Sequence, residues 1–205
     1  DDVTYPHQLR AIKSLPYHIT PSIFPPNKMN FKTPLLTKNL KHYIIHLPLE
    51  SYSKQMNKMH KTIFISTPYS KMEERIKEIR RLFPNAKFIN NHTGSKFSQN
   101  YKASKQLYSL MIKNGFTFID SRTSQSSKFK AISSEFNRPY LYSSLFIDHK
   151  ADINYTLRQL KRAVKLAKKR GFAIVIGHPH KTTFKALRKA KAILKDVKVV
   201  YIDEL

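Results

Sequence analysis

The 205-residue sequence contains no cysteine, which excludes disulfide bonds and cysteine-ligated zinc fingers. Any bound metal therefore needs histidine and carboxylate ligands, a set that suits zinc or another first-row divalent ion. The sequence also lacks an apolar run of about 18 residues, the length that indicates a membrane-spanning helix, and it shows no signal-peptide pattern. It begins at Asp1 without a methionine, so its start does not indicate where the protein resides.

Acidic side chains are scarce: 13 Asp and Glu stand against 38 Lys and Arg, for a formal net charge of +25. Such a field attracts anionic polymers, including nucleic acid, acidic cell-wall glycan and anionic membrane surfaces. Compositional bias is the simpler interpretation, because lysine is spread over nearly every segment. The sequence contains no RNA-binding aromatic signature or helix-turn-helix motif, so we expect no nucleic-acid partner.

Short apolar runs alternate with amphipathic segments along the whole chain. This alternation predicts an α/β fold with a mostly parallel sheet and right-handed crossovers. The length and the absence of a linker predict one domain over residues 1–205. We expect strands at 42–46, 87–90, 116–119, 144–147, 172–176 and 197–202. We expect the longer helices at 70–82, 101–113, 153–170 and 182–194, the first of them opened by a capping box of Ser70 and Glu73.

Five of the apolar runs break abruptly into residues that can hold a metal or move a proton. Ligands of α/β folds bind at the carboxyl ends of strands, so these residues predict a catalytic rim. The runs lead into His46, into Asn90-Asn91-His92, into Asp120, into Asp148 and into His178.

His46 and His92 are the candidate metal ligands among these residues. As a ligand, His46 needs a neutral ring nitrogen, with the other nitrogen held by a partner, and Glu50 is a candidate for that partner or for a further ligand. Gly94 permits a tight turn after His92, which would let His92 and Ser95 point into a cleft. The alternatives are a hydrogen-bonded rim histidine at position 46 and an ordinary Asn/Gly turn around position 92.

The remaining candidates are groups that could transfer or orient protons. Asp1 and Asp2 form a vicinal carboxylate pair, in which one member can bind a metal while the other accepts a proton from water. His178, between Gly177 and a proline, is placed to donate a proton to a leaving group. Solvated terminal carboxylates are the alternative for the first pair.

Asp120 and Arg122 follow the run that ends at residue 119. Arg122 could pair with a carboxylate and set its pKa or orientation. The equally simple alternative is that Asp120 caps the turn that follows it.

Taken together, these motifs resemble the divergent polysaccharide deacetylase family, a relative of the carbohydrate esterases that remove N- or O-acetyl groups from glycans. The matching segments occur in the family's order and cover essentially the whole chain. They are residues 1–3, 21–26, 46–50, 90–95, 118–124, 146–148 and 176–179.

The resemblance implies a distorted (β/α) barrel of about seven mostly parallel strands, a divalent metal for which zinc is favoured, and a periplasmic or exported location. It assigns Asp1 as general base, Asp2 as metal ligand and His178 as general acid. His46 corresponds to the first histidine of the superfamily's metal motif. The superfamily usually has a second histidine four residues later; here that position is Glu50.

Because of this departure, His92 is our choice as third metal ligand. We expect Asp120 and Arg122 to assist catalysis. We place Asn90, Asn91, Ser95 and Asp148 in the substrate cleft. The predicted function is metal-dependent removal of acyl groups, taken to be acetyl, from an anionic cell-envelope polysaccharide. The alternative is a non-catalytic module that keeps the deacetylase scaffold and binds acidic envelope glycan through its charge.

Overall fold

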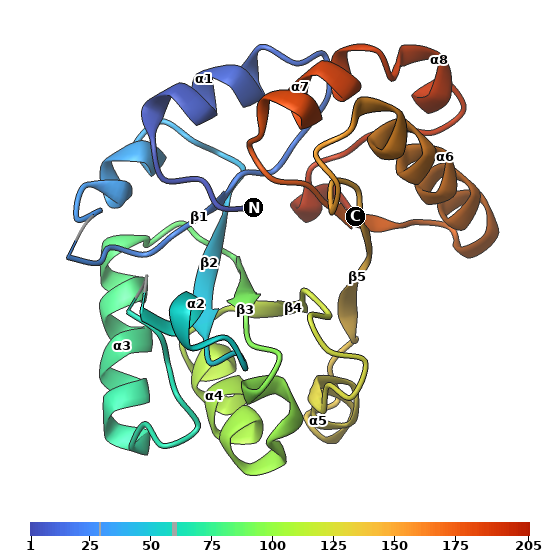
Figure 1. Cartoon of the computed structure of the whole chain (residues 1–205). Coiled ribbons are helices and arrows are strands. Elements are labelled where there is room, and N and C mark those ends of the chain that lie inside the picture. Colours follow the sequence, from blue (N-terminus) through green and yellow to red (C-terminus); the bar gives the residue numbers. More distant parts are fainter. Residues whose placement is uncertain (29, 59–60) are drawn as a thin grey trace. The chain divides into compact units, whose positions relative to one another are not determined.

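A computed structural model of the chain describes residues 1–28, 30–58 and 61–205. The chain forms two compact units, one made of residues 1–22 and 143–205 and the other of residues 23–142. It passes from one unit to the other inside two strands, β1 (Ser22–Ile23) and β5 (Leu141–Phe146), which are labelled in Figure 1. The expectation of a single domain stays a prediction, and we describe each unit by itself.

The strands follow one another in the sheet in the same order as in the sequence, β1-β2-β3-β4-β5-β6. The other four strands are β2 (Ile44–Leu49), β3 (Phe88–Thr93), β4 (Thr117–Asp120) and β6 (Ile174–Ile176). All the pairings from β2 to β6 are parallel. This sequential order is typical of a (β/α) barrel, whereas the strand order of a doubly wound sheet reverses. The described residues contain six strands where about seven were expected.

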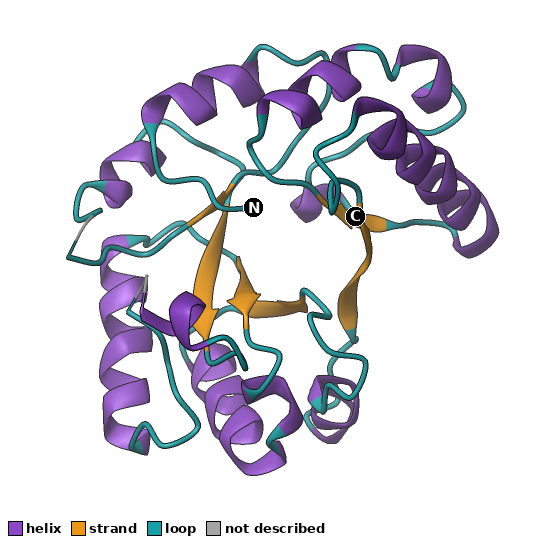
Figure 2. Cartoon of the chain, in the orientation of Figure 1, coloured by secondary structure: helices purple, strands orange, loops and turns teal. Residues whose placement is uncertain are grey.

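In the 23–142 unit, helices cover strands most of whose residues are buried. The elements are η1 (Thr33–Thr37), α2 (Lys54–Lys58), α3 (Tyr69–Leu82), η2 (Phe97–Gln99), α4 (Tyr101–Lys113) and α5 (Phe129–Glu135). Helix α4 packs against α3, α5 and β4 (Figure 2). Every residue of β2 is buried, as expected for a strand that is covered on both faces.

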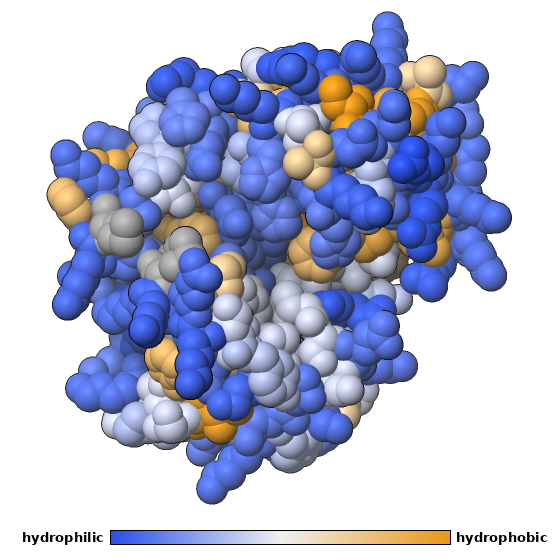
Figure 3. Space-filling view, in the orientation of Figure 1, coloured by the Kyte–Doolittle hydropathy of each residue, from blue (hydrophilic) through white to orange (hydrophobic). Residues whose placement is uncertain are grey.

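The other unit contains α1 (Pro6–Lys13), α6 (Ile153–Arg170), α7 (Lys181–Arg188), α8 (Lys191–Leu194) and η3 (Ile202–Glu204). Its core cluster joins Ile147, Leu160 and Ala190. Helix α6 begins at Asp152, whose side chain accepts a hydrogen bond from the Tyr155 amide, and ends before Gly171 at a positive φ of 88°. Hydrophilic residues cover most of the face shown in Figure 3.

The predicted boundaries of α4 and α6 are correct, whereas other expectations differ from the structure. Strand β5 begins at Leu141, three residues before the predicted start, and β6 begins at Ile174, two residues after it. Strands β2 and β3 run three residues further than predicted, to Leu49 and Thr93. The capping box at Ser70 does not form, because the helix already begins at Tyr69 and its first amides bond to the carbonyl of Pro68.

The last two differences lie at the end of the chain. The expected helix 182–194 is divided into α7 and α8, because the amides of Lys189 and Ala190 bond three residues back and tighten the end of α7. Residues 197–202 were expected to form a strand, but the amides of Tyr201 and Ile202 bond to side chains instead. None of the helices in the described residues is long and apolar enough to cross a membrane.

Candidate active site

The pairing of β2 with β3 brings two histidines onto the same face of the sheet. In the register, His46 is opposite Asn90 and Pro48 is opposite His92. Because side chains alternate along a strand, His46, Asn90 and His92 share a face. His46 Nδ1 lies 2.8 Å from Asn90 Oδ1, and His46 Nε2 lies 3.2 Å from His92 Nδ1. Both imidazoles are buried.

The bond to Asn90 determines which nitrogen of His46 carries the proton. The amide oxygen of Asn90 accepts hydrogen bonds only, so His46 Nδ1 is the donor and its Nε2 presents a lone pair toward His92. A side chain that holds one ring nitrogen and orients the other is the usual arrangement around a metal-binding histidine. The ring of Phe24 packs against both imidazoles, with centroids 5.0 and 4.8 Å away.

The separation of the two ring nitrogens fits a shared metal ion. Two nitrogens bound to one tetrahedral zinc at about 2.0–2.1 Å lie about 3.3 Å apart, and His46 Nε2 and His92 Nδ1 are 3.2 Å apart. A hydrogen bond from His92 to His46 has the same length. The two nitrogen donors therefore fit zinc. Metal titration distinguishes a pair that binds a metal ion from a pair joined only by a hydrogen bond.

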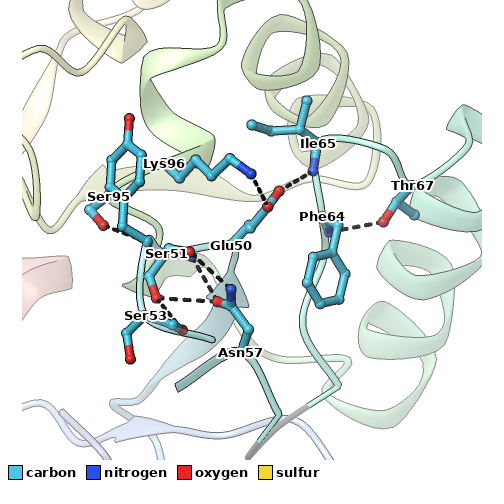
Figure 4. A network of polar contacts seen from close by, with 10 residues as sticks. Glu50, Ser51, Ser53, Asn57, Phe64, Ile65, Thr67, Ser95 and Lys96 are labelled. Atoms are coloured by element: carbon cyan, nitrogen blue, oxygen red, sulfur yellow. Dashed lines mark hydrogen bonds and ion pairs between the residues drawn. The ribbon is translucent and has the colours of Figure 1, made fainter. Parts of the chain in front are cut away.

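Glu50, the other candidate for a ligand position, uses both carboxylate oxygens in contacts within the 23–142 unit. Oε1 is 2.7 Å from Lys96 Nζ, and Oε2 accepts a hydrogen bond from the Ile65 amide at 2.8 Å (Figure 4). Its carbonyl accepts a further bond from Phe97 N. Glu50 thus connects the end of β2 with the segments around Ile65 and Lys96. Because both of its carboxylate oxygens already have partners, we favour His92 over Glu50 as the partner of His46.

Asn91 and Ser95, which we placed in the substrate cleft, also make contacts that stabilise the strand ends. The Asn91 side-chain oxygen accepts a hydrogen bond from Ser121 N at 2.9 Å, and its carbonyl accepts one from Ser121 Oγ at 2.7 Å. Ser95 Oγ accepts a bond from the Tyr52 amide at 3.4 Å. These bonds connect β3 to the segment after β4 and to the segment after β2. A role in the cleft stays a prediction for both residues.

Asp120 is fully buried at the end of β4 and accepts three hydrogen bonds. Its Oδ1 accepts from the Arg122 amide at 2.8 Å, and its Oδ2 accepts from Ser127 Oγ at 2.7 Å and from the Tyr140 hydroxyl at 2.8 Å. The Arg122 guanidinium lies over the ring of Tyr142, 5.1 Å from its centroid. Burial and the Asp120 carboxylate raise the pKa of Tyr140. The bond from the Arg122 amide to Asp120 is the one expected if Asp120 caps the turn that follows it.

In the other unit, Asp148 and His178 form a carboxylate–imidazole pair just after β5 and β6, in which Asp148 is buried and His178 is partly exposed. His178 Nδ1 is 2.9 Å from Asp148 Oδ1, while the His178 amide and Thr183 Oγ1 donate to Asp148 Oδ2 at 2.6 and 2.7 Å. Burial alone would raise the pKa of the Asp148 carboxyl, but the bonds from His178 and Thr183 lower it below its ordinary value. Because Nδ1 is held by the carboxylate, Nε2 is the nitrogen that His178 can use for proton transfer.

Asp148 and His178 also form, with His180, a group whose ligand atoms lie within 4.8 Å of one another and could hold a metal. The carboxylate already has three partners, whereas His180 is exposed. We therefore interpret the pair as a proton-transfer dyad.

The segment around Asp1 and Asp2 belongs to the same unit as this dyad. The Asp1 nitrogen donates to the Gly177 carbonyl at 2.7 Å, one residue before His178. Asp2 has a positive φ of 58°, a conformation that Asp tolerates better than most residues. The metal role of Asp2 stays a prediction.

Sequence reasoning did not identify three residues that support the candidate groups. Phe24 packs on both histidines, Tyr140 bonds to Asp120, and Thr183 bonds to Asp148. Phe24 lies in one of the segments that match the family, which was a usable signal. Tyr140 and Thr183 have no such signal, because each reaches its carboxylate from a separate segment.

A model of the divergent polysaccharide deacetylase family matches residues 1–205. The chain belongs to this family. It is 27% identical over 194 residues to the uncharacterized protein YibQ of Escherichia coli (strain K12), covering 92% of this chain and 60% of that protein. An uncharacterized protein of Haemophilus influenzae is 25% identical over 163 residues, covering 79% of this chain and 58% of that protein. The chain thus spans about three fifths of the length of both relatives.

A solved structure shares the fold of this chain. The crystal structure of the uncharacterized protein ATU2773 from Agrobacterium tumefaciens C58 matches with a TM-score of 0.81 and 19% identity, over 96% of this chain and 82% of that chain. The likeness, together with the sequential parallel strand order, confirms the predicted fold class, a distorted (β/α) barrel.

Proposed function

We propose that this member of the divergent polysaccharide deacetylase family is a metal-dependent hydrolase that removes acetyl groups from a cell-envelope polysaccharide, in the periplasm or outside the cell. The observation that carries the proposal is the His46–His92 pair, whose facing nitrogens are 3.2 Å apart with His46 oriented by Asn90. Membership of the family supports a polysaccharide as the substrate.

The metal ligands in this proposal are His46, His92 and Asp2, with zinc favoured because all three offer nitrogen or carboxylate donors. The two histidines are chosen on their geometry, whereas Asp2 is chosen on its place in the family's motif order. A bound zinc ion would polarise the acyl carbonyl and lower the pKa of a water molecule.

Two side chains of the other unit are assigned the proton transfers. Asp1 accepts a proton from the attacking water, and His178 donates one to the departing sugar nitrogen or oxygen. Asp148 holds Nδ1 of His178, so that the ring keeps one tautomer and one orientation through the cycle. The assignment of Asp1 rests on motif order, and that of His178 rests on motif order together with its bond to Asp148.

The test is metal analysis of the purified chain combined with acetate release from an acetylated glycan. We expect about one zinc per chain and acetate release that stops with a chelator and returns with zinc. His46→Ala and His92→Ala should lose both the metal and the activity. His7→Ala, which changes an exposed histidine of α1, is the matched control and should keep both.

Two results would count against the proposal. One is a chain that binds no metal at neutral pH. The other is acetate release that is unchanged in His46→Ala and His178→Ala. Glycan binding that survives chelation but is lost at high salt, without acetate release, would instead support a non-catalytic binding module.

A further inference from the structure

A cavity of about 400 Å³ opens in the 23–142 unit where the chain leaves β2 and β3. These are the strands that carry His46 and His92. The residues of its wall that matter here are Glu50, Tyr52, Lys54, Lys58, Phe64 and Lys96. They combine positive charge with exposed aromatic rings. The charge indicates a ligand with an anionic group, and the rings indicate a ligand with a flat apolar face.

The charge of the cavity is positive after its internal ion pair is taken into account. Glu50 is paired with Lys96 at 2.7 Å, and its second oxygen is held by a backbone amide. Within the described residues, neither Lys54 nor Lys58 pairs with a carboxylate. The two lysines are four residues apart on α2 and therefore share a face of the helix, where like charges repel each other and a bound anion would offset the repulsion.

The aromatic side chains of the cavity are unusually accessible for their size. Tyr52 is 66% exposed and Phe64 is 37% exposed. Exposed rings beside a cavity offer a flat apolar surface to a ligand. A sugar ring has one face made of C–H groups that can cover such a surface, while its hydroxyl and acidic groups remain in contact with water and lysine.

The walls are fixed in place before any ligand binds. Asn57 Oδ1 accepts a bond from the Ser51 amide at 2.8 Å, and Asn57 Nδ2 donates to the Ser51 carbonyl at 2.9 Å, which fastens α2 to the end of β2 (Figure 4). Lys96 N and Phe97 N donate to the Glu50 carbonyl and join the segment after β3 to the same wall. A preformed wall lowers the entropy that binding would cost.

We propose that this cavity binds an anionic sugar unit of the glycan, with its uronate carboxylate or sugar phosphate on Lys54 and Lys58 and its ring on Tyr52 or Phe64. The inference rests on the proposed function for the identity of the ligand as a glycan. The cavity follows the strands that carry the histidine pair, so its occupant determines which polysaccharides this unit accepts. It makes the enzyme selective for acidic chains.

The experiment is calorimetric titration of the whole chain, in chelator, with three glycans of equal length: hexagalacturonate, a phosphorylated mannohexaose and neutral mannohexaose. We expect at least one acidic hexamer to bind at least 10-fold more tightly than the neutral one, and to weaken as salt is added. The acidic hexamer that binds more tightly identifies the anion as carboxylate or phosphate.

The double variant K54Q/K58Q should weaken binding of the acidic hexamer at least 10-fold. The matched control, K87Q/K102Q, removes two exposed lysines elsewhere in the same unit and should change binding less than twofold. Tyr52→Ala should weaken binding of the acidic and neutral hexamers by the same factor, because it removes the stacking surface only. Thermal unfolding of each variant checks that the fold is kept.

Equal binding of acidic and neutral hexamers would overturn the inference, and so would equal losses in K54Q/K58Q and K87Q/K102Q. Because the titrations are done in chelator, they do not depend on the metal. Acidic-glycan binding that needs Lys54 and Lys58, in a chain that releases no acetate, would keep the inference and reject the proposed function. Acetate release with no preference for acidic glycan would keep the proposed function and reject the inference.

Discussion

Asp148 holds His178 at two points, accepting one hydrogen bond from the ring Nδ1 at 2.9 Å and another from the backbone amide at 2.6 Å. The two bonds fix the ring relative to its own backbone, so the side chain and the turn after β6 move as one piece. Thr183 donates a third bond to the same carboxylate at 2.7 Å. This geometry leads to the first prediction.

Asp148→Asn should slow acetate release about 10²–10⁴-fold while leaving metal content unchanged, because the ring loses the acceptor that fixes its tautomer. Nitrogen-15 NMR of the histidine rings should show that His178 changes tautomer in this variant. Asp152→Asn is the matched control in the same unit, since Asn is also a good N-cap for α6. Equal activity of the two variants would show that Asp148 does not position His178.

The stability of the chain should also depend on the Asp148 carboxyl at acid pH. Its pKa is lowered in the folded state from an ordinary value of 3.8 by the bonds from His178 and Thr183, which outweigh the effect of burial. The unfolded chain therefore takes up the proton first as pH falls, and the contribution of Asp148 to stability, present above about pH 4, is lost below it. The unfolding temperature of the wild type should fall more steeply than that of Asp148→Asn between pH 5 and pH 2. Parallel curves would contradict this assignment.

Asn90 should tune the metal affinity through His46 without touching the metal itself. Asn90→Ala removes the acceptor of His46 Nδ1, and we expect zinc affinity to fall about 10–100-fold. Asn90→Asp keeps an acceptor at the same place and should retain most of the affinity. Asn85→Ala, at an exposed position before β3, is the control. Competition titration with a zinc indicator gives the affinities, and equal values for Asn90→Ala and Asn85→Ala would contradict the role.

The sequence predicts the helices of this fold better than the ends of its strands. Helix α4 occupies the predicted residues, because a long apolar period and a glycine beyond its end are local signals. Strand β3 extends over Asn90, Asn91 and His92, although polar residues usually end a strand. Asn90 and His92 contact His46 of β2, and Asn91 bonds to Ser121 just after β4, and no local pattern contains that information.

In the candidate site too, the sequence indicates which residues are candidates but not which residues they bond to. The sequence selects His46, His92 and His178 as candidates because each follows an apolar run, although β2 continues past His46 to Leu49. The sequence does not show that Asp148, placed in the substrate cleft, bonds to His178, nor that Glu50 pairs with Lys96. Each of these partners comes from a different strand end or loop, so the pairing depends on tertiary structure alone.

Gly177 allows a close approach to Ile147, next to the dyad, that an added methyl group would crowd. A Cβ at this position would lie 3.0 Å from Ile147 Cδ1 and 3.1 Å from Ile147 Cγ1. Gly177→Ala should therefore destabilise the chain by about 1–3 kcal/mol, the usual cost of overpacking. It should also slow acetate release, because Ile147 immediately precedes Asp148.

Ile147→Val removes the Cδ1 atom and should relieve part of this clash. In a double-mutant cycle, Gly177→Ala combined with Ile147→Val should be less destabilised than the sum of the single variants. Denaturant unfolding of the four proteins measures the coupling. Additive losses would mean that the backbone at Gly177 moves away from Ile147. The dyad would then be expected to move with it, because the peptide group between Gly177 and His178 bonds to the Asp1 nitrogen through its carbonyl and to Asp148 through its amide.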